Sequence, residues 1–264
     1  MKNSILIIFL FIISCKRENI EYYSNGKIRE KYFINNGKID GNYEEYFENG
    51  KIKLKHIFKN GVKSDSSIYF FKNKKIQKIL YYLKNDTLIE KEFSNKGKII
   101  SIGKTYKNKM IGKWKFYKTN GNLDKIIEYI NLCGVQYVNQ GWYYDLNGKI
   151  VKKGSNYFSL EIKKNKFRIN EIIDIKFHYN PLLSEESISV ACISPKIKEN
   201  FCNLNNERLD TIFSNKHNFE FKLSFSEIGI KNIRGFIREE YFYSNKGKFG
   251  ERTIYINIPL LIEK

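Results

Sequence analysis

A repeat of about 24 residues runs through the first half of the chain, and no other feature constrains the fold as strongly. Residues 46–52, Tyr-Phe-Glu-Asn-Gly-Lys-Ile, show its pattern, and only Lys74 replaces the glycine in one copy. A second aromatic series keeps the same step half a period later, and two series with one period indicate a repeat protein. The first series returns every 23 to 27 residues, at Tyr22, Tyr46, Phe70, Phe93, Tyr117 and Tyr144, and the second lies at Phe33, Phe58, Tyr82, Tyr106 and Tyr129.

Each repeat contains the residues of a β-hairpin. Asn-Gly pairs separate runs rich in Tyr, Phe and Ile, such as residues 41–46. These runs suit strands, and Asn-Gly favours a type I′ turn, in which both central residues need a positive φ. A single hairpin cannot bury its apolar face alone, so successive units must stack, and we expect Tyr46 and Tyr117 to be buried in equivalent places of successive hairpins. The sequence therefore predicts an all-β chain whose residues 22–154 form an elongated, meandering antiparallel sheet.

Two copies match a known repeat pattern closely, Gly-x-Trp/Tyr-x-x-Tyr-x-x-x-Gly-x-Leu. Residues 112–123 fit it throughout, and residues 41–52 fit it with Tyr43 in the Trp position and Ile52 in the Leu position. The chain thus resembles MORN-repeat proteins, and more closely the bacterial variant described as an antitoxin-type repeat. Trp142 is one residue out of register, which predicts a degenerate last unit. The resemblance implies the fold, but such repeats serve scaffolding, membrane association and partner binding alike.

The first residues predict export. Lys2 precedes nine apolar residues, 5–13, which are too few to cross a bilayer as a helix but suit a secretory signal. The run ends at Ser14-Cys15 and resembles the lipobox of bacterial lipoproteins. That resemblance implies a signal peptide of residues 1–14, lipid on Cys15, and a tether over 15–21. The residues after Cys15 resemble those of outer-membrane lipoproteins. The alternative is an ordinary signal peptide with a chance cysteine.

The charge of the chain is strongly basic but evenly spread. Lys and Arg number 47 against 28 Asp and Glu, a formal charge of +19. In an exported chain with no single basic patch, this balance predicts a solvated surface rather than a nucleic-acid site. Attraction for anionic lipid or polysaccharide of the envelope is the second interpretation.

One set of basic residues has a fixed place in the repeat, directly after the turn. If equivalent turns lie along one edge of the sheet, their ammonium groups would form a row facing an anionic surface. The alternative is that lysine merely solvates a tight turn in a lysine-rich protein. We call this set the lysine row: Lys27, Lys51, Lys75, Lys98 and Lys149.

The second half, residues 155–264, lacks the repeat but keeps short β-prone runs. In 218–223 apolar residues alternate with polar ones, as in a strand with one buried face. Seven runs in this length predict a β-sandwich of immunoglobulin-like type, although the Cys…Trp…Cys pattern of that family is missing. The expected strands are 157–163, 172–179, 187–193, 209–213, 218–225, 235–243 and 252–258.

The cysteine count is odd once Cys15 is set aside for lipid. Cys133, Cys192 and Cys202 remain, so at least one thiol is free or joins another chain. Cys192 and Cys202 lie ten residues apart across an expected strand and loop, which makes their disulfide one prediction. Buried free thiols are the other.

Catalytic and metal-binding patterns do not emerge. The three histidines, His56, His178 and His217, lie far apart, and neither H-E-x-x-H nor G-x-S-x-G occurs. Residues 103–105, Gly-Lys-Thr, lack the earlier glycine of a phosphate-binding loop. The pairs 44–45 and 239–240, both Glu-Glu, would point to opposite faces of a strand.

We therefore expect a non-enzymatic binding or scaffold protein, anchored in the envelope and acting through its repeat sheet, without cofactor or metal. Its partner would be a protein or an anionic envelope surface. One alternative is an antitoxin or immunity protein that neutralises a toxin at the envelope. Another is an envelope hydrolase that uses scattered Asp, Glu and His, which would require several perturbed ionisable groups in one pocket.

Overall fold

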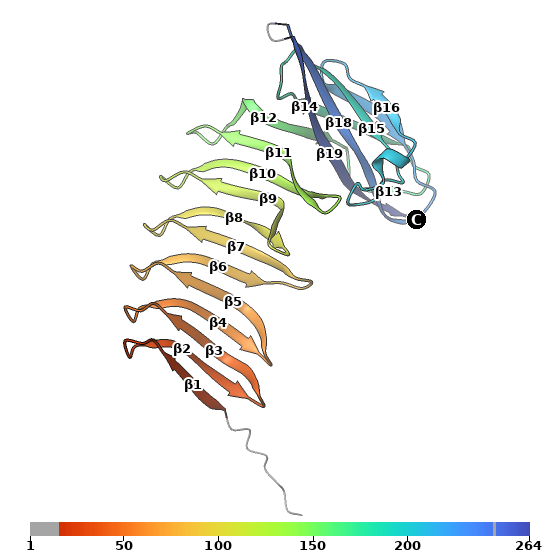
Figure 1. The fold of residues 1–264 in the computed structure, drawn as a ribbon. Coiled ribbons are helices and arrows are strands. Elements are labelled where there is room, and N and C mark those ends of the chain that lie inside the picture. Colours follow the sequence, from red (N-terminus) through yellow and green to blue (C-terminus); the bar gives the residue numbers. More distant parts are fainter. Residues whose placement is uncertain (1–15, 245–246) are drawn as a thin grey trace, which may run out of the picture. The chain divides into compact units, whose positions relative to one another are not determined.

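A computed structural model describes residues 16–244 and 247–264 of the chain (Figure 1). Nearly all secondary structure in these ranges is β, and a single 3₁₀ turn lies at Leu204–Asn206. The chain divides into two compact units, residues 1–99 and 100–264. Within the described ranges, no helix is long and apolar enough to span a membrane. The predicted signal peptide and Cys15 lie outside them.

In the first unit, antiparallel strands follow one another in chain order, as the hairpin prediction requires. The predicted tether, 15–21, is wrong from Arg17 onward, because this segment already pairs with β2, Arg17 opposite Ile34. Ion pairs join it to β2, Glu18 with Lys31 at 2.7 Å and Glu21 with Arg29. The strands are β1 (Arg17–Tyr22), β2 (Ile28–Asn35), β3 (Lys38–Tyr46), β4 (Ile52–Lys59), β5 (Val62–Phe70), β6 (Ile76–Tyr82) and β7 (Thr87–Phe93).

The two ends of each hairpin use different turns. At the half-period end, Asn60 and Gly61 have φ of 52° and 82°, the type I′ geometry predicted from Asn-Gly. At the other end the prediction is wrong, because only the glycine is left-handed, as at Gly26 with φ of 81°. Asn25 instead accepts the N–H of Lys27 through its side chain at 3.1 Å. Lys74, which replaces the glycine in one copy, takes the same conformation at φ 70°.

An aromatic row crosses one face of the first unit. Tyr32 stacks on Tyr43 with ring centroids 5.8 Å apart, and Tyr43 lies 5.6 Å from His56. His56 is buried beside Ser67, and burial lowers its pKa to about 4. Tyr46, expected to be buried, is only half-buried.

The second unit begins with the remaining repeat strands. Trp114 fills the Trp position of the repeat and is 1% exposed, with its indole N–H donating to the Lys104 carbonyl at 2.8 Å. A methyl group on Gly103 would meet the Trp114 ring at 2.2 Å, so the glycine of Gly-Lys-Thr has a packing role. Tyr117 is half-buried, not buried as expected. The strands are β8 (Ile99–Tyr106), β9 (Lys109–Tyr117), β10 (Leu123–Leu132), β11 (Val135–Tyr144) and β12 (Ile150–Glu161).

Strand β12 belongs to the repeats and to the C-terminal segment at once. Its first part pairs with β11, Ile150 opposite Tyr144, and its second part pairs with β14, Tyr157 opposite Asn180. The predicted boundary between residues 154 and 155 therefore falls inside one strand. Beyond β14 (Ile173–Asn180), the same sheet ends on β17 (Asn218–Leu223).

The other C-terminal strands form a separate five-stranded sheet. In spatial order they are β13 (Lys166–Arg168), β19 (Lys248–Glu263), β18 (Gly229–Tyr243), β15 (Ile188–Ile193) and β16 (Asp210–Phe213). Seven of the C-terminal strands coincide with the expected runs. Sequence reasoning missed β13 and underestimated the lengths of β18 and β19.

Both C-terminal sheets contribute to one apolar core. Ile175 and Phe177 of β14, Ile237 of β18 and Ile254 of β19 are almost completely buried within it. Glu239 is fully buried at its border and accepts hydrogen bonds from the Tyr179 hydroxyl at 2.7 Å and from the Leu182 and Leu183 amides at 2.9 and 2.8 Å. Its neighbour Glu240 is exposed, so the two point to opposite faces as predicted.

Candidate ligand-binding groove

The last repeat hairpin is fastened to the five-stranded sheet by polar side chains. Asn139 on β11 donates to the Tyr255 carbonyl at 3.0 Å and accepts the Tyr255 N–H at 2.6 Å, so its amide pairs as a strand backbone would. The Arg252 guanidinium donates to the Tyr137 hydroxyl and to the Asn156 side chain at 2.6 and 2.8 Å. These bonds fix β19 against the face of β11.

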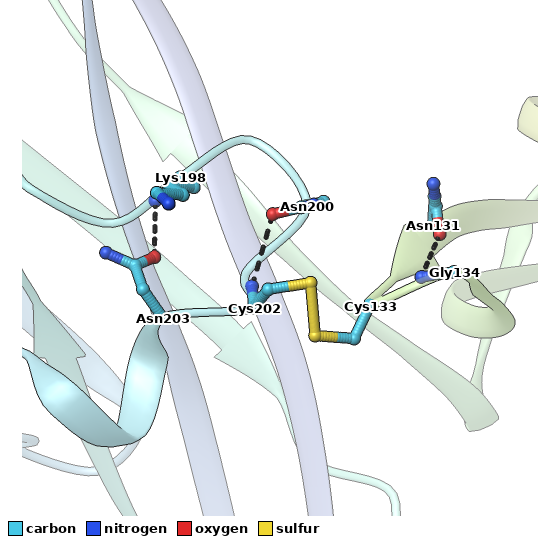
Figure 2. Close-up of a disulfide and its surroundings, with 7 residues drawn as sticks. All are labelled: Asn131, Cys133, Gly134, Lys198, Asn200, Cys202 and Asn203. Carbon is cyan, nitrogen blue, oxygen red and sulfur yellow. Dashed lines mark hydrogen bonds between the residues drawn. A yellow bond between two sulfur atoms is a disulfide. The ribbon is translucent and has the colours of Figure 1, made fainter.

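A second connection runs through a disulfide, which Figure 2 shows. Cys133 lies in the two-residue turn between β10 and β11, and it bonds to Cys202 in the segment between β15 and β16, with the Cα atoms 4.8 Å apart. The Cys133 amide also donates to the Asn200 carbonyl at 3.0 Å. Asn203 accepts the Lys198 N–H at 2.8 Å and so stiffens the segment. The hairpin turn and the segment therefore hold one another in place.

The predicted Cys192–Cys202 disulfide is wrong. Cys192 lies on β15 opposite Thr211 of β16, and its sulfur lies 3.8 Å from the Thr211 hydroxyl as a free thiol. The strand ends at Ile193, and the following segment carries Cys202 to the β10–β11 turn. The separation of ten residues in the sequence does not reveal where this segment runs in space.

Between these two connections lies an open groove of about 980 Å³, within the second unit. Strand faces form most of its surface, and the disulfide-bonded segment supplies one side. We call it the junction groove. Its lining residues are Ile111, Gly112 and Lys113 of β9, Glu128–Asn131 of β10, Asn139, Gln140 and Trp142 of β11, Phe158 and Leu160 of β12, Lys198–Phe201, and Tyr255 and Asn257 of β19.

A β-bulge places the polar groups of the junction groove. Ile127 faces Gly141 and Tyr129 faces Val138, so Asn139 and Gln140 together lie opposite the single residue Glu128. Bulges redirect side chains in this way. Both amides donate to Oε2 of Glu128, at 2.8 and 2.7 Å. Oε1 of Glu128 is engaged by neither amide, and Glu128 lines the groove.

The remaining bonds of the two amides are internal. Gln140 accepts the Phe158 N–H at 2.9 Å, and both Asn139 and Gln140 are buried. The amides therefore act as supports that hold the Glu128 carboxylate in one orientation. A carboxylate fixed by two donors is pre-organised for a ligand, because little side-chain freedom is lost on binding.

Aromatic rings line the rest of the junction groove. The centroids of the Trp142 and Tyr157 rings lie 5.8 Å apart. The ammonium of the exposed Lys113 lies 4.7 Å from the centroid of the Trp142 ring. Phe201 packs on Tyr255 with centroids 4.9 Å apart. Burial raises the pKa of Tyr255, as it does for Tyr129.

The lysine row occupies equivalent turn positions. The carbonyls of Lys27, Lys51 and Lys75 each accept an N–H from four residues earlier at 2.8 Å. In the first unit, the turns that carry these three lysines lie along one edge of the sheet (Figure 1). The stem of Lys27 lies beside Gly50, where an added methyl group would contact its Cδ at 3.8 Å. Lys98 has the same place in its turn, and so does Lys149, which belongs to the second unit.

The histidines and the glutamate pair of the repeats have structural partners. His178 bonds to Asn218 and His217 to Ser189, each at 2.9 Å. Glu44 and Glu45 pair with Lys55 and Lys53 at 2.9 and 2.6 Å. Across residues 16–244 and 247–264, no group of three or more His, Cys, Asp or Glu side chains could hold a metal ion.

The junction groove was missed at the level of the sequence. Register shifts also occur in β2–β3, β4–β5 and β8–β9, and the β10–β11 hairpin differs in placing two adjacent amides, Asn139 and Gln140, at its bulge. Adjacent amides inside a strand that should alternate apolar and polar residues were the available signal.

Comparison with known proteins agrees with the repeat interpretation. Three segments, residues 18–36, 39–60 and 110–131, match the MORN repeat variant. They correspond to the hairpins β1–β2 and β3–β4 and to the pair β9–β10. The matched segments end before β11. No curated protein matches the chain.

Proposed function

We propose that the chain is a non-enzymatic binding protein of the bacterial envelope that holds its ligand in the junction groove. The observation that carries this proposal is the Glu128 carboxylate, fixed by two buried amides and surrounded by aromatic rings in a groove of about 980 Å³. Binding sites combine apolar walls with a few well-placed polar groups in this manner. Repeats of the MORN type suggest a binding or scaffold role as well.

The envelope part of the proposal rests on the N-terminus and on the disulfide. Export and lipid attachment at Cys15 follow from the signal-like residues 1–14 and the resemblance to a lipobox, with the outer membrane as the expected location. A disulfide between Cys133 and Cys202 suits an oxidising compartment outside the cytosol. Cys15→Ala should abolish labelling by radioactive fatty acid, and undiminished labelling would refute the anchor.

We also propose that the C-terminal segment is an immunoglobulin-like sandwich. Of its seven longer strands, β12, β14 and β17 lie in one sheet and β19, β18, β15 and β16 in the other. Such domains place their first, second and fifth strands together, opposite the third, sixth and seventh, and their fourth strand joins the fifth in the constant type, whereas β16, the fourth strand here, pairs with the third. This order supports the assignment beyond the strand count.

An envelope hydrolase is the competing function, since the groove contains two carboxylates. Hydrolysis of a glycosidic bond needs an acid and a second carboxylate, both held in place across the substrate. Glu128 is held, but Glu199 is an exposed residue of the segment between β15 and β16. Only the Glu128 carboxylate of this pair is held by hydrogen-bond donors, and a single held carboxylate supports binding rather than turnover.

A photo-crosslinking experiment tests the junction groove directly. A photoreactive residue replaces Leu160, which lines the groove and is 36% exposed, in the membrane-anchored protein in its own cells. The matched control replaces Phe213, which is 78% exposed on β16 and outside the groove. We expect adducts at position 160 only. Equal labelling at both positions, or none, would refute the groove as the binding site. A secreted toxin in the adduct would identify the immunity function.

A further inference from the structure

We infer that the ligand of the junction groove is an uncharged glycan chain. This inference rests on the proposed binding function and adds the chemistry of the ligand. A sugar ring has apolar C–H faces and a rim of hydroxyl groups, so it needs flat aromatic surface next to fixed hydrogen-bonding groups. Trp142, Tyr255 and Phe158 line the groove and supply the rings, and the exposed Lys113 ammonium over Trp142 has to move aside for a sugar to stack there. The Glu128 carboxylate supplies an acceptor for hydroxyl protons.

The charges of the junction groove favour an uncharged ligand. Lys113 and Lys198 carry two positive charges, and Glu128 and Glu199 carry two negative ones. A strongly anionic chain would meet the Glu128 carboxylate, and a cationic ligand would meet the ammonium of Lys113 above the Trp142 ring. Hydroxyl groups can donate to the carboxylate and accept from the lysines, so a neutral sugar satisfies both signs.

The backbone around the groove argues against an extended peptide as the ligand. Peptides that bind to sheets add a strand to a free edge and hydrogen-bond to its backbone. Here β10 and β11 are paired on both sides, β10 with β9 and β11, and β11 with β10 and β12. The ligand therefore faces side chains, as a sugar does when it stacks on rings.

The size of the groove indicates a chain rather than a single sugar. Its volume of about 980 Å³ lies at the upper end of the range for small-molecule sites, roughly 300–1,000 Å³. A single sugar ring is smaller than the drug-sized ligands that fill such sites. The groove is also open, so a longer chain can pass through it.

The two tryptophans make the test direct. Trp114 is 1% exposed and is shielded from a soluble quencher, whereas the half-buried Trp142 lines the groove. Acrylamide quenching of the full chain, purified in detergent, therefore reports on Trp142. The probe is selected by screening the protein on an array of neutral hexose and N-acetylhexosamine oligosaccharides. The oligosaccharide that binds most tightly is then used in solution. We expect it to protect Trp142 from quenching.

Two variants assign the binding to named groups. Glu128→Gln keeps an oxygen for Asn139 and Gln140 but presents an amide in place of Oε1, and it should weaken binding about tenfold or more, as for a lost bond to a charged group. Trp142→Ala, followed by calorimetry, should weaken binding to a similar degree. The controls are Glu220→Gln and Phe249→Ala, exposed changes outside the groove. Urea unfolding verifies that each variant is folded.

The outcomes separate this inference from the proposed function. The inference that the ligand is a glycan would be overturned if no neutral oligosaccharide bound, or if Glu128→Gln and wild type bound with equal affinity. If crosslinking from position 160 then captures a protein, the junction groove stands and only its ligand class is wrong. If position 160 captures nothing either, both proposals fail.

Discussion

Removing the Cys133–Cys202 disulfide should destabilise the second unit strongly. The two cysteines are 69 residues apart, and the chain-entropy expression for a closed loop of that length gives about 4 kcal/mol at 25 °C. The Cys133 amide still donates to Asn200 without the disulfide, which opposes part of the loss. We therefore expect Cys133→Ser to lower the free energy of unfolding by about 3–4 kcal/mol.

Urea unfolding, followed by circular dichroism without reductant, measures this loss. Serine preserves the size of the side chain at a turn position with φ of 51°, whereas Asn or Gly would relieve backbone strain and confuse the comparison. Cys202→Ser and the double variant should lose the same amount, because all three lack one bond. Cys192→Ser, at the free thiol, should change little. Additive losses, or a Cys133→Ser midpoint equal to that of wild type, would refute the cross-link.

Three further changes test the repeats. Trp114→Ala should cost about 3–5 kcal/mol in urea unfolding, since it empties a buried aromatic site, and a loss below 1 kcal/mol would refute this packing. The pKa of His56 is lowered from 6.5 to about 4, so the unfolded chain binds more protons and stability should fall as pH drops from 6.5 to 4. His56→Gln should remove this part of the pH dependence and the exposed His178→Gln should not, as acid titration of the urea midpoint will measure. Changing the whole lysine row to Gln should weaken binding to anionic vesicles and its salt dependence, by up to about 1 kcal/mol per lysine. If changing five lysines of the C-terminal segment to Gln weakened vesicle binding equally, the lysine row would have no specific role in binding.

Periodic features of the fold were predictable from the sequence. Spacing of aromatic residues and glycines placed the hairpins, and alternation placed strands such as β14 and β17. The exposed fraction of Tyr46 was not predictable, because periodicity indicates which face a residue shares and not how far neighbours cover it. The type of turn at one end of each hairpin was not predictable from the sequence either. Asn25 has an Asn-Gly pair but uses its side chain as a hydrogen-bond acceptor, which dipeptide preference does not reveal.

The groove residues were beyond sequence reasoning because they meet through long-range contacts. Asn139 and Tyr255 are 116 residues apart, and Cys133 meets Cys202 across three intervening strands of the C-terminal segment and the end of the repeats. No local pattern encodes such pairings. The local signal in the sequence was the adjacent amide pair Asn139 and Gln140 inside a strand, at the bulge that positions Glu128.

The shared strand β12 limits how such a chain can change its length. A hairpin duplicated within β1–β7 would pair with equivalent strands on either side. Recombination between copies there therefore yields another regularly paired sheet. A residue gained or lost between Ile150 and Tyr157 shifts one of these residues relative to the other, so β12 can no longer keep its register with both β11 and β14. Copy number should therefore vary among natural variants upstream of β8, while the segment from Trp114 to Glu161 keeps a constant length.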